Sequence, residues 1–157
     1  MKNETIIWRK GPRINLRPVQ EDDLPFFNQI INDPKNNQFL IVDHPLGMDA
    51  QREWGKKVMS GDRDQITLSI TMSDGKLIGN IALRIYPEQQ NAETGTLLGF
   101  EYHKKGFATE AKMLLLDYTF NQRAVRHVIS KILAHNQDSV SYGKRCGYTH
   151  VLSLIHI

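Results

Sequence analysis

The strictest alternation of apolar and polar residues in the chain lies between positions 66 and 85. Apolar residues or glycine occupy every second place from Ile66 to Met72 and again from Leu77 to Ile85, with Asp74-Gly75 between the two runs. A period of two places the apolar side chains on one face of a strand, and Asp-Gly is a common hairpin turn. We therefore predict two adjacent antiparallel strands over 66–72 and 77–85, joined by a two-residue turn at Asp74-Gly75.

Three further segments have the composition of strands. The alternation in Ile14-Asn15-Leu16-Arg17 predicts a short strand that Pro18 ends. A second strand is expected over 93–100, directly before a basic turn. The segment 127–134 is apolar on both faces, which is typical of a strand in the interior of a sheet.

Helical spacing of apolar residues appears in four other segments. The first begins with Asp22, Asp23 and Pro25, residue types that suit the first turn of a helix, and stops at Asp33-Pro34. The second begins at Asp49 as its N-cap and has a thin apolar stripe, so we expect it near the surface. The third is apolar on opposite faces and is expected to be buried. These helices are expected at 22–31, about 49–61, 107–120 and 138–146, the last ending at Gly147, with an irregular segment over 35–47.

Composition limits what this chain is. With 157 residues, 40% of them hydrophobic and 24% charged, it is long enough for one domain, 1–157, and has no apolar run that would span a bilayer. The first residues do not form a signal peptide, and the lone Cys146 forms no internal disulfide, so we expect a cytoplasmic protein. The net charge of +3 suits an anionic ligand, whereas no stretch interleaves basic and aromatic residues as nucleic-acid binding would require.

The segment from His103 to Ala111 is a basic turn that runs directly into an apolar helix. A glycine followed by small residues lets the backbone approach an anion, and the free N–H groups of the first helical turn point at it. Neither Gly-Lys-Ser nor Gly-Lys-Thr follows, so a nucleoside-triphosphate P-loop fits poorly. The pattern predicts a pyrophosphate cradle formed by His103, Lys104, Lys105, Gly106, Phe107, Ala108 and Thr109.

Three blocks in order resemble the GNAT superfamily of N-acetyltransferases, most closely its branch of ribosomal-protein N-terminal acetyltransferases. In the turn, His103, Gly106 and Ala108 stand where the superfamily has Arg or Gln, then Gly, then Gly or Ala. The other two blocks are Ile14–Pro18 with its acidic helix start, and Asn136-Gln137-Asp138-Ser139 followed by Gly147-Tyr148. The resemblance covers most of the chain and rests on the order of the blocks more than on any one of them.

The turn departs from the superfamily pattern at two positions. His103 replaces the usual Arg or Gln, and Lys104 stands where glycine is frequent. If Lys104 must adopt a positive φ, the strain costs about 1 kcal/mol or more. The two departures together put the affinity of the turn for the cofactor in question.

The resemblance implies an α/β (α+β) fold, a mixed and mainly antiparallel central sheet flanked by helices. Two antiparallel strands normally follow the Gly-aromatic pair, but only nine residues remain after Tyr148, enough for one. Our hypothesis is that the sheet lacks its last strand because the chain is truncated within 149–157, where Leu152–Ile157 is foreign adapter sequence. Such an exposed sheet edge would invite a homodimer.

The resemblance also implies direct transfer of an acetyl group from acetyl-CoA to a primary amine, without a metal. The backbone N–H groups of Leu98, Gly99 and Phe100 are then expected to polarise the thioester at a β-bulge. Glu93 is the first candidate for the base, with Glu101 or a water chain as alternatives.

The last helix supplies the remaining candidates. Ser139 is the candidate acid, because Tyr142 stands one place too early for the tyrosine that many family members use and is expected to pack elsewhere. Asn136 is expected to bind the pantetheine arm or to cap the last helix. The acceptor is a protein N-terminal amine by first choice. A small amine such as a polyamine or an aminoglycoside is the alternative acceptor. The alternative to an enzyme is a catalytically weak module that binds acyl-CoA.

Overall fold

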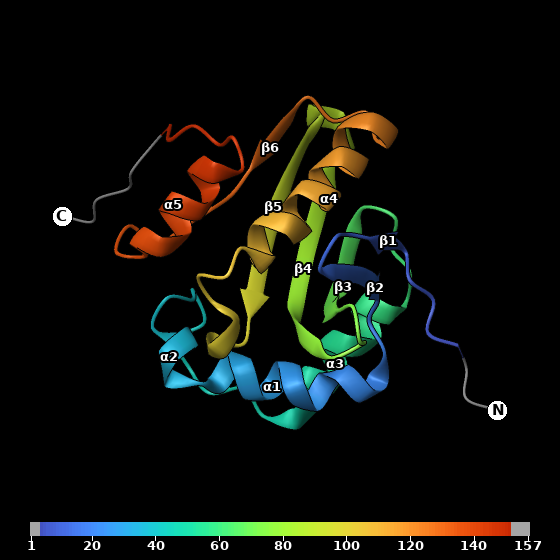
Figure 1. Cartoon of the computed structure of the whole chain (residues 1–157), viewed down its shortest axis with the longest axis vertical. Helices are drawn as coiled ribbons and strands as arrows, with labels where there is room; N and C mark the ends of the chain where they lie inside the picture. Colours follow the sequence, from blue (N-terminus) through green and yellow to red (C-terminus); the bar gives the residue numbers. More distant parts are fainter. Residues whose placement is uncertain (1–3, 152–157) are drawn as a thin grey trace.

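The computed structural model describes residues 4–151, and within them the backbone forms one mixed six-stranded sheet in the order β1-β2-β3-β4-β5-β6 (Figure 1). Every neighbouring pair is antiparallel except β5 and β6, which are parallel. The expectation of a mainly antiparallel sheet is confirmed. The strands are β1 (Arg9–Lys10), β2 (Ile14–Pro18), β3 (Gln65–Met72), β4 (Leu77–Tyr86), β5 (Asn91–Leu98) and β6 (His127–Ile129).

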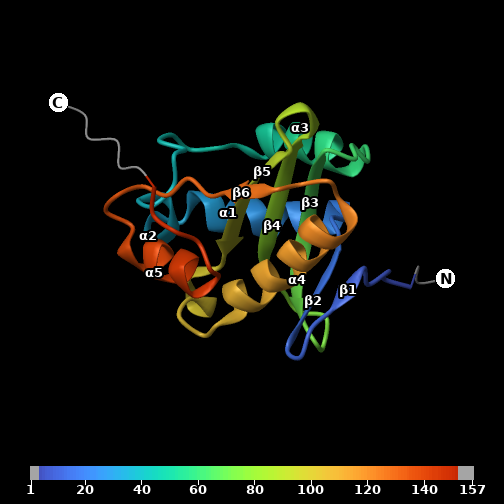
Figure 2. The same cartoon turned by 90° about the horizontal axis from the view of Figure 1, so that it is seen from above.

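Helices cover both faces of the sheet, with α4 on one face and α1 and α3 on the other (Figure 2). α5 lies beside β6 at the edge of the sheet (Figure 1). The helices are α1 (Leu24–Asn32), α2 (Pro34–Asn37), α3 (Met48–Met59), α4 (Phe107–Gln122) and α5 (Gln137–Arg145), with 3-10 turns η1 (Glu21–Asp23), η2 (Pro87–Gln89) and η3 (Phe100–Tyr102).

Each face of the sheet has its own core. Under α4, Ala111 and Leu115 pack on strand residues such as Ile81. On the other face, Phe27 of α1 meets the ring of Trp54 of α3 edge-on, with the ring centroids 5.8 Å apart. The thin apolar stripe of α3 therefore does pack, and its Gly55 lies so close to α1 that an added Cβ would meet Leu24 at 2.7 Å.

The predicted hairpin is present, but its turn differs from the prediction. Gly75 N–H donates to Met72 O at 2.9 Å, and Met72 N–H donates to Lys76 O at 2.8 Å. The loop therefore has three residues, 73–75, with Gly75 at φ +92° in the position that favours glycine. The two-residue turn was wrong because Asp-Gly also suits the last two places of a three-residue loop.

Burial was overestimated in two places. β6 has three residues rather than the eight of 127–134, and it is an edge strand among the described residues, with Ile129 48% exposed. α4 buries one face, while Met113 and Phe120 lie about half exposed on the other. Apolar residues on opposite faces were therefore not evidence of an interior position.

Three element boundaries also differ from the prediction. α3 begins after Gly47, so Asp49 lies in its first turn rather than at its N-cap. The one-turn helix α2 occupies part of the segment expected to be irregular, and Asp33 caps it by accepting from Lys35 N–H at 2.9 Å. The expected tail strand lies mostly in 152–157, outside the described residues.

Candidate active site

A cavity of about 860 Å³ lies between β5, the start of α4 and α5. The segment after α2 closes one side of it, where Phe39 stacks near His135 and Gln38 O accepts from His135 Nε2 at 2.9 Å. The residues that line the cavity are Asn36, Gln38, Phe39, Leu40, Thr96, Leu97, Leu98, Phe100, Tyr102, His103, Lys104, Gly106, Phe107, Ala108, Thr109, Asn136, Asp138, Ser139, Ser141, Tyr142 and Arg145.

β5 presents to this cavity backbone N–H groups that have no partner among residues 4–151. Gly99 N–H donates to Ile78 O at 2.9 Å, so by the alternation of an antiparallel ladder the N–H groups of Leu98 and Thr96 point away from β4. On that side the pairing with β6 ends at Glu93. The separation of β5 from β6 therefore leaves donors that can polarise a carbonyl oxygen.

The expected bulge at 98–100 is absent. The β4–β5 register is regular from Asn91 to Leu98, and Gly99 N–H is already bonded. The donors are freed because β6 separates from β5, a feature of the neighbouring strand that the local sequence does not contain.

The basic turn has the geometry of an anion site. Lys104 adopts φ +59° and Gly106 φ +83°, and Gly106 forms the N-cap of α4 without a side chain to cap it. The N–H groups of Phe107, Ala108 and Thr109 therefore remain as donors in the first turn of a 16-residue helix, whose dipole favours negative charge there. This arrangement fits a pyrophosphate.

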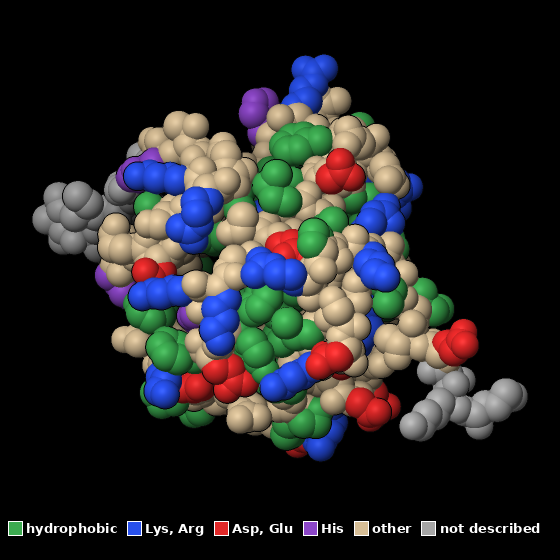
Figure 3. Space-filling model, viewed as in Figure 1, with side chains coloured by type: hydrophobic (Ala, Val, Ile, Leu, Met, Phe, Trp, Pro, Cys, Tyr) green, Lys and Arg blue, Asp and Glu red, His purple; other side chains and the backbone are tan. Residues whose placement is uncertain are grey.

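Charged side chains surround the turn. Lys and Arg side chains gather over α5 and the N-terminal end of α4 (Figure 3). Lys104 Nζ lies 3.4 Å from Asp138 Oδ2, so this exposed ion pair joins the turn to α5. His103 instead donates Nε2–H to Leu98 O at 3.2 Å, because a carbonyl oxygen only accepts, and so its ring is directed toward the end of β5.

α5 brings three candidate residues to the cavity. Asn136 caps the helix by accepting from Ser139 N–H at 3.2 Å, one of its two expected roles. Ser139 and Tyr142 lie three residues apart and share the cavity face. Because Tyr142 lines the cavity, the expectation that it packs elsewhere was wrong, and its OH shares a hydrogen bond of 3.0 Å with Thr96 Oγ1. Burial raises the pKa of the Tyr142 phenol.

The two acidic base candidates lie outside the cavity lining. Glu93 is five residues from Leu98 along an extended strand, about 16 Å, and its carboxylate lies 3.2 Å from Lys131 Nζ. Glu101 is exposed in η3 and does not line the cavity either. Cys146 is buried behind α5, where burial raises the pKa of its thiol.

Sequence reasoning missed Asn36, although it is 2% exposed at the cavity. Its Nδ2 donates to Ile30 O at 3.0 Å and to Leu98 O at 3.2 Å, which ties the end of α1 to the end of β5. No sequence signal marks this residue, because it lies in a segment without periodicity.

A buried lysine, Lys112, lies against β5. Lys112 of α4 is 1% exposed and donates to Thr94 Oγ1 at 2.7 Å, and Thr94 also shares a hydrogen bond of 2.9 Å with Tyr148 OH. Burial lowers the pKa of Lys112 to about 8. The rings of Tyr142 and Tyr148 lie over the amine at 5.5 and 5.7 Å.

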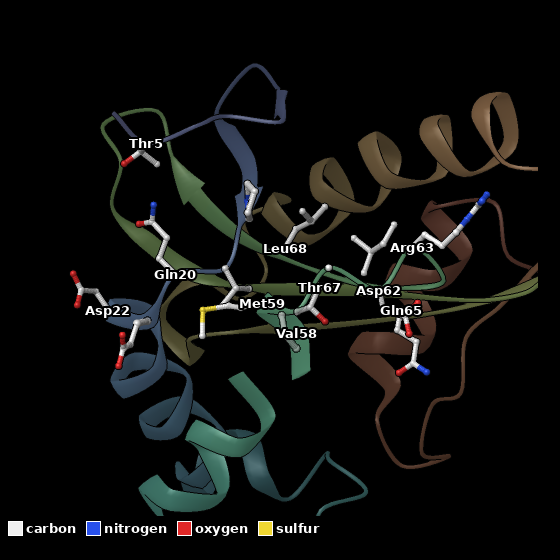
Figure 4. A pocket seen from close by; sticks show the side chains of 15 residues that line it. Thr5, Gln20, Asp22, Val58, Met59, Asp62, Arg63, Gln65, Thr67 and Leu68 are labelled. Atoms are coloured by element: carbon white, nitrogen blue, oxygen red, sulfur yellow. The ribbon is translucent and has the colours of Figure 1, made fainter. Parts of the chain in front are cut away.

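A second cavity of about 1020 Å³ lies between η1, the end of α3 and the start of β3 (Figure 4). Its labelled residues include Gln20, Met59 and Arg63, and none of the predicted site residues lines it. The smaller cavity is therefore the candidate site. Among residues 4–151, no cluster of three or more His, Cys, Asp or Glu is placed to hold a metal ion, and no helix is long and apolar enough to cross a membrane.

Known proteins share both the sequence pattern and the fold. The model of the acetyltransferase (GNAT) domain matches residues 13–149. The SPbeta prophage-derived uncharacterized N-acetyltransferase YokL of Bacillus subtilis (strain 168) is 24% identical over 140 residues, which cover 88% of this chain and 77% of that protein.

Two solved structures show the similarity of the fold. The spermidine N-acetyltransferase from Vibrio cholerae, in complex with CoA and spermine, has a TM-score of 0.82 at 22% identity, over 90% of this chain and 84% of that one. The ribosomal L7/L12 alpha-N-protein acetyltransferase RimL, in complex with coenzyme A, has a TM-score of 0.80 at 17% identity, over 92% and 84%.

Proposed function

The chain belongs to the GNAT acetyltransferase family and is an acetyl-CoA-dependent N-acetyltransferase, and we propose that its acceptor is the α-amine of a protein N-terminus. The charge of the cavity carries this choice. Asp138 is the single carboxylate among the described lining residues, and it is paired with Lys104. A polyamine carries several cations that would each need a carboxylate or another acceptor, whereas a peptide presents one amine.

The apolar side of the cavity supports the same acceptor. Phe39, Leu40 and Phe100 line it and offer contacts for the side chains that follow a terminal amine. RimL, which has the same fold, acts on a protein N-terminus by its name. These observations favour a peptide over a small polycation.

Acetyl-CoA fits the remaining features. The N–H groups at the start of α4 would hold its pyrophosphate, and the free edge of β5 at Leu98 and Thr96 would hydrogen bond the pantetheine arm and the thioester oxygen. The side-chain amide of Asn136, which lines the same cavity at the start of α5, would hydrogen bond that arm.

The reaction then needs two proton transfers besides the attack. The amine attacks the thioester carbon, the N–C bond forms, and the C–S bond breaks to release the thiolate of CoA. We assign the loss of the ammonium proton to water, because Glu93 lies outside the cavity. Ser139 is the proposed donor to the thiolate, because its hydroxyl lies on the cavity face of α5.

Release of free CoA thiol across a panel of amines tests the proposal. We expect turnover with N-terminal peptides and little with spermidine or aminoglycosides, and acetyl-CoA and CoA should raise the thermal stability whereas ATP should not. Ser139→Ala should lower kcat about 10–100-fold with KM for acetyl-CoA unchanged. Turnover of spermidine without turnover of any peptide would refute the assigned acceptor.

A further inference from the structure

We propose that Arg13 binds a phosphate group of CoA and so supplies the guanidinium that the basic turn lacks at His103. Arg13 precedes β2 and lies 90 residues before the turn in the sequence. The proposal rests on acetyl-CoA being the acetyl donor.

Arg13 is held rigidly although its side chain is 49% exposed. Its Nε donates to Glu110 Oε2 at 2.9 Å, and its Nη1 donates to Lys105 O at 2.9 Å. The guanidinium carbon also lies 4.7 Å from the centroid of the Phe107 ring. An exposed arginine with three such contacts is pre-organised, so little side-chain entropy is lost when it binds a ligand.

The guanidinium has donors left at the turn. No described residue accepts a hydrogen bond from Nη2, which lies 3.0 Å from the position that a Cβ of Gly106 would occupy. The two N–H groups of Arg13 Nη2 therefore lie beside Gly106, close to the backbone N–H groups in the first turn of α4. A guanidinium edge of this kind matches the oxygen spacing of a phosphate.

Two other basic groups of the turn are engaged elsewhere. His103 donates to Leu98 O, and Lys104 is paired with Asp138. Glu110 leaves Nη2 of Arg13 free, because its Oε2 accepts from Nε and its Oε1 accepts the backbone N–H groups of Arg13 and Ile14 at 2.7 and 3.1 Å. Arg13 is thus a cation held in place at this turn by three contacts.

The test compares the affinities of variants for acetyl-CoA by calorimetry. Arg13→Gln should weaken binding of acetyl-CoA about tenfold, the loss expected for one charge-assisted hydrogen-bond pair. The affinity of Arg13→Lys should lie between those of wild type and Arg13→Gln, because lysine keeps the positive charge but lacks the paired N–H donors of a guanidinium. Arg52→Gln is the matched control: it removes an exposed arginine charge on α3, from an ion pair with Asp49, and should change nothing.

Two comparisons separate direct binding from an indirect role. Glu110→Gln weakens the support of Arg13 without removing its guanidinium, so it should cost less than threefold in affinity. Acetyl-dephospho-CoA, which lacks the 3′-phosphate, identifies the phosphate: the effect of Arg13→Gln persists if the pyrophosphate is bound and disappears if the 3′-phosphate is bound.

Equal affinity of wild type and a folded Arg13→Gln protein for acetyl-CoA would overturn the proposal, as would equal losses in Arg13→Gln and Glu110→Gln. Thermal unfolding without ligand reports whether each variant is folded, and Arg13→Lys provides the measurement if Arg13→Gln is not. Failure of the wild type itself to bind acetyl-CoA would instead contradict the proposed function.

Discussion

Replacing Lys104 with glycine should make the protein more stable, although it removes a charged side chain from the basic turn. Lys104 adopts φ +59°, and a left-handed backbone costs a residue with a Cβ roughly 1–2 kcal/mol. The added chain entropy of glycine in the unfolded state offsets about 0.4–1 kcal/mol of this. The lost ion pair with Asp138 joins two exposed side chains and contributes about 0–1 kcal/mol.

The expected net gain is therefore about 0.5 kcal/mol, which corresponds to a rise in Tm of about 1–2 °C for a chain of this length. Thermal unfolding monitored by circular dichroism measures it. Asp138→Asn measures separately how much stability the ion pair contributes. When the net gain of Lys104→Gly is corrected for that loss, the gain from the backbone alone should be about 1 kcal/mol.

Lys105→Gly is the matched control, because Lys105 is the same residue type one position later and its φ is not positive. It should lower the free energy of unfolding by about 0.5–1 kcal/mol. Equal decreases in the Lys104→Gly and Lys105→Gly proteins would refute the strain argument.

Three further predictions concern buried polar groups. Lys112→Met should raise the free energy of unfolding at pH 7 by roughly 2 kcal/mol, because burial lowers the pKa of Lys112 to about 8. Measured across pH, this gain should shrink as the pH rises above about 8 and vanish above roughly pH 11, where the amine is neutral in both states. Asp23→Asn should cost about 3–5 kcal/mol in urea denaturation at pH 7, because it leaves the buried Arg17 unpaired. Hydrogen bonds from Arg17 and Ser69 keep the pKa of Asp23 low despite its burial, so its contribution is present above about pH 4 and is lost as the pH falls through that lowered pKa. Tyr142→Phe should cost about 1 kcal/mol of stability and leave kcat within threefold, whereas a larger fall in kcat would move the acid role from Ser139 to Tyr142.

Local patterns predicted which elements exist better than where they lie in the fold. The alternation at 66–85 gave the central hairpin, because period-two burial is a property of the two strands themselves. The position of β6 at the sheet edge depends on which elements pack beside it, and an apolar run carries no information on that. The same limit explains the exposed Met113 and Phe120 on α4.

In the candidate site, too, local patterns predicted the contiguous segment but not the residues that other elements contribute. Residues 103–109 are contiguous, so a motif in the sequence located the turn. Asn36 and Thr96 line the cavity from other elements, and Arg13 contacts the turn from the segment before β2. A departure at one motif position cannot be interpreted without those elements. His103 in place of the usual Arg or Gln puts the affinity for CoA in question if the turn is considered alone, but Arg13 brings a guanidinium to Gly106 from the segment before β2. On our proposal for Arg13, a donor at the anion comes from a different element, so the motif position alone does not give the number of donors there.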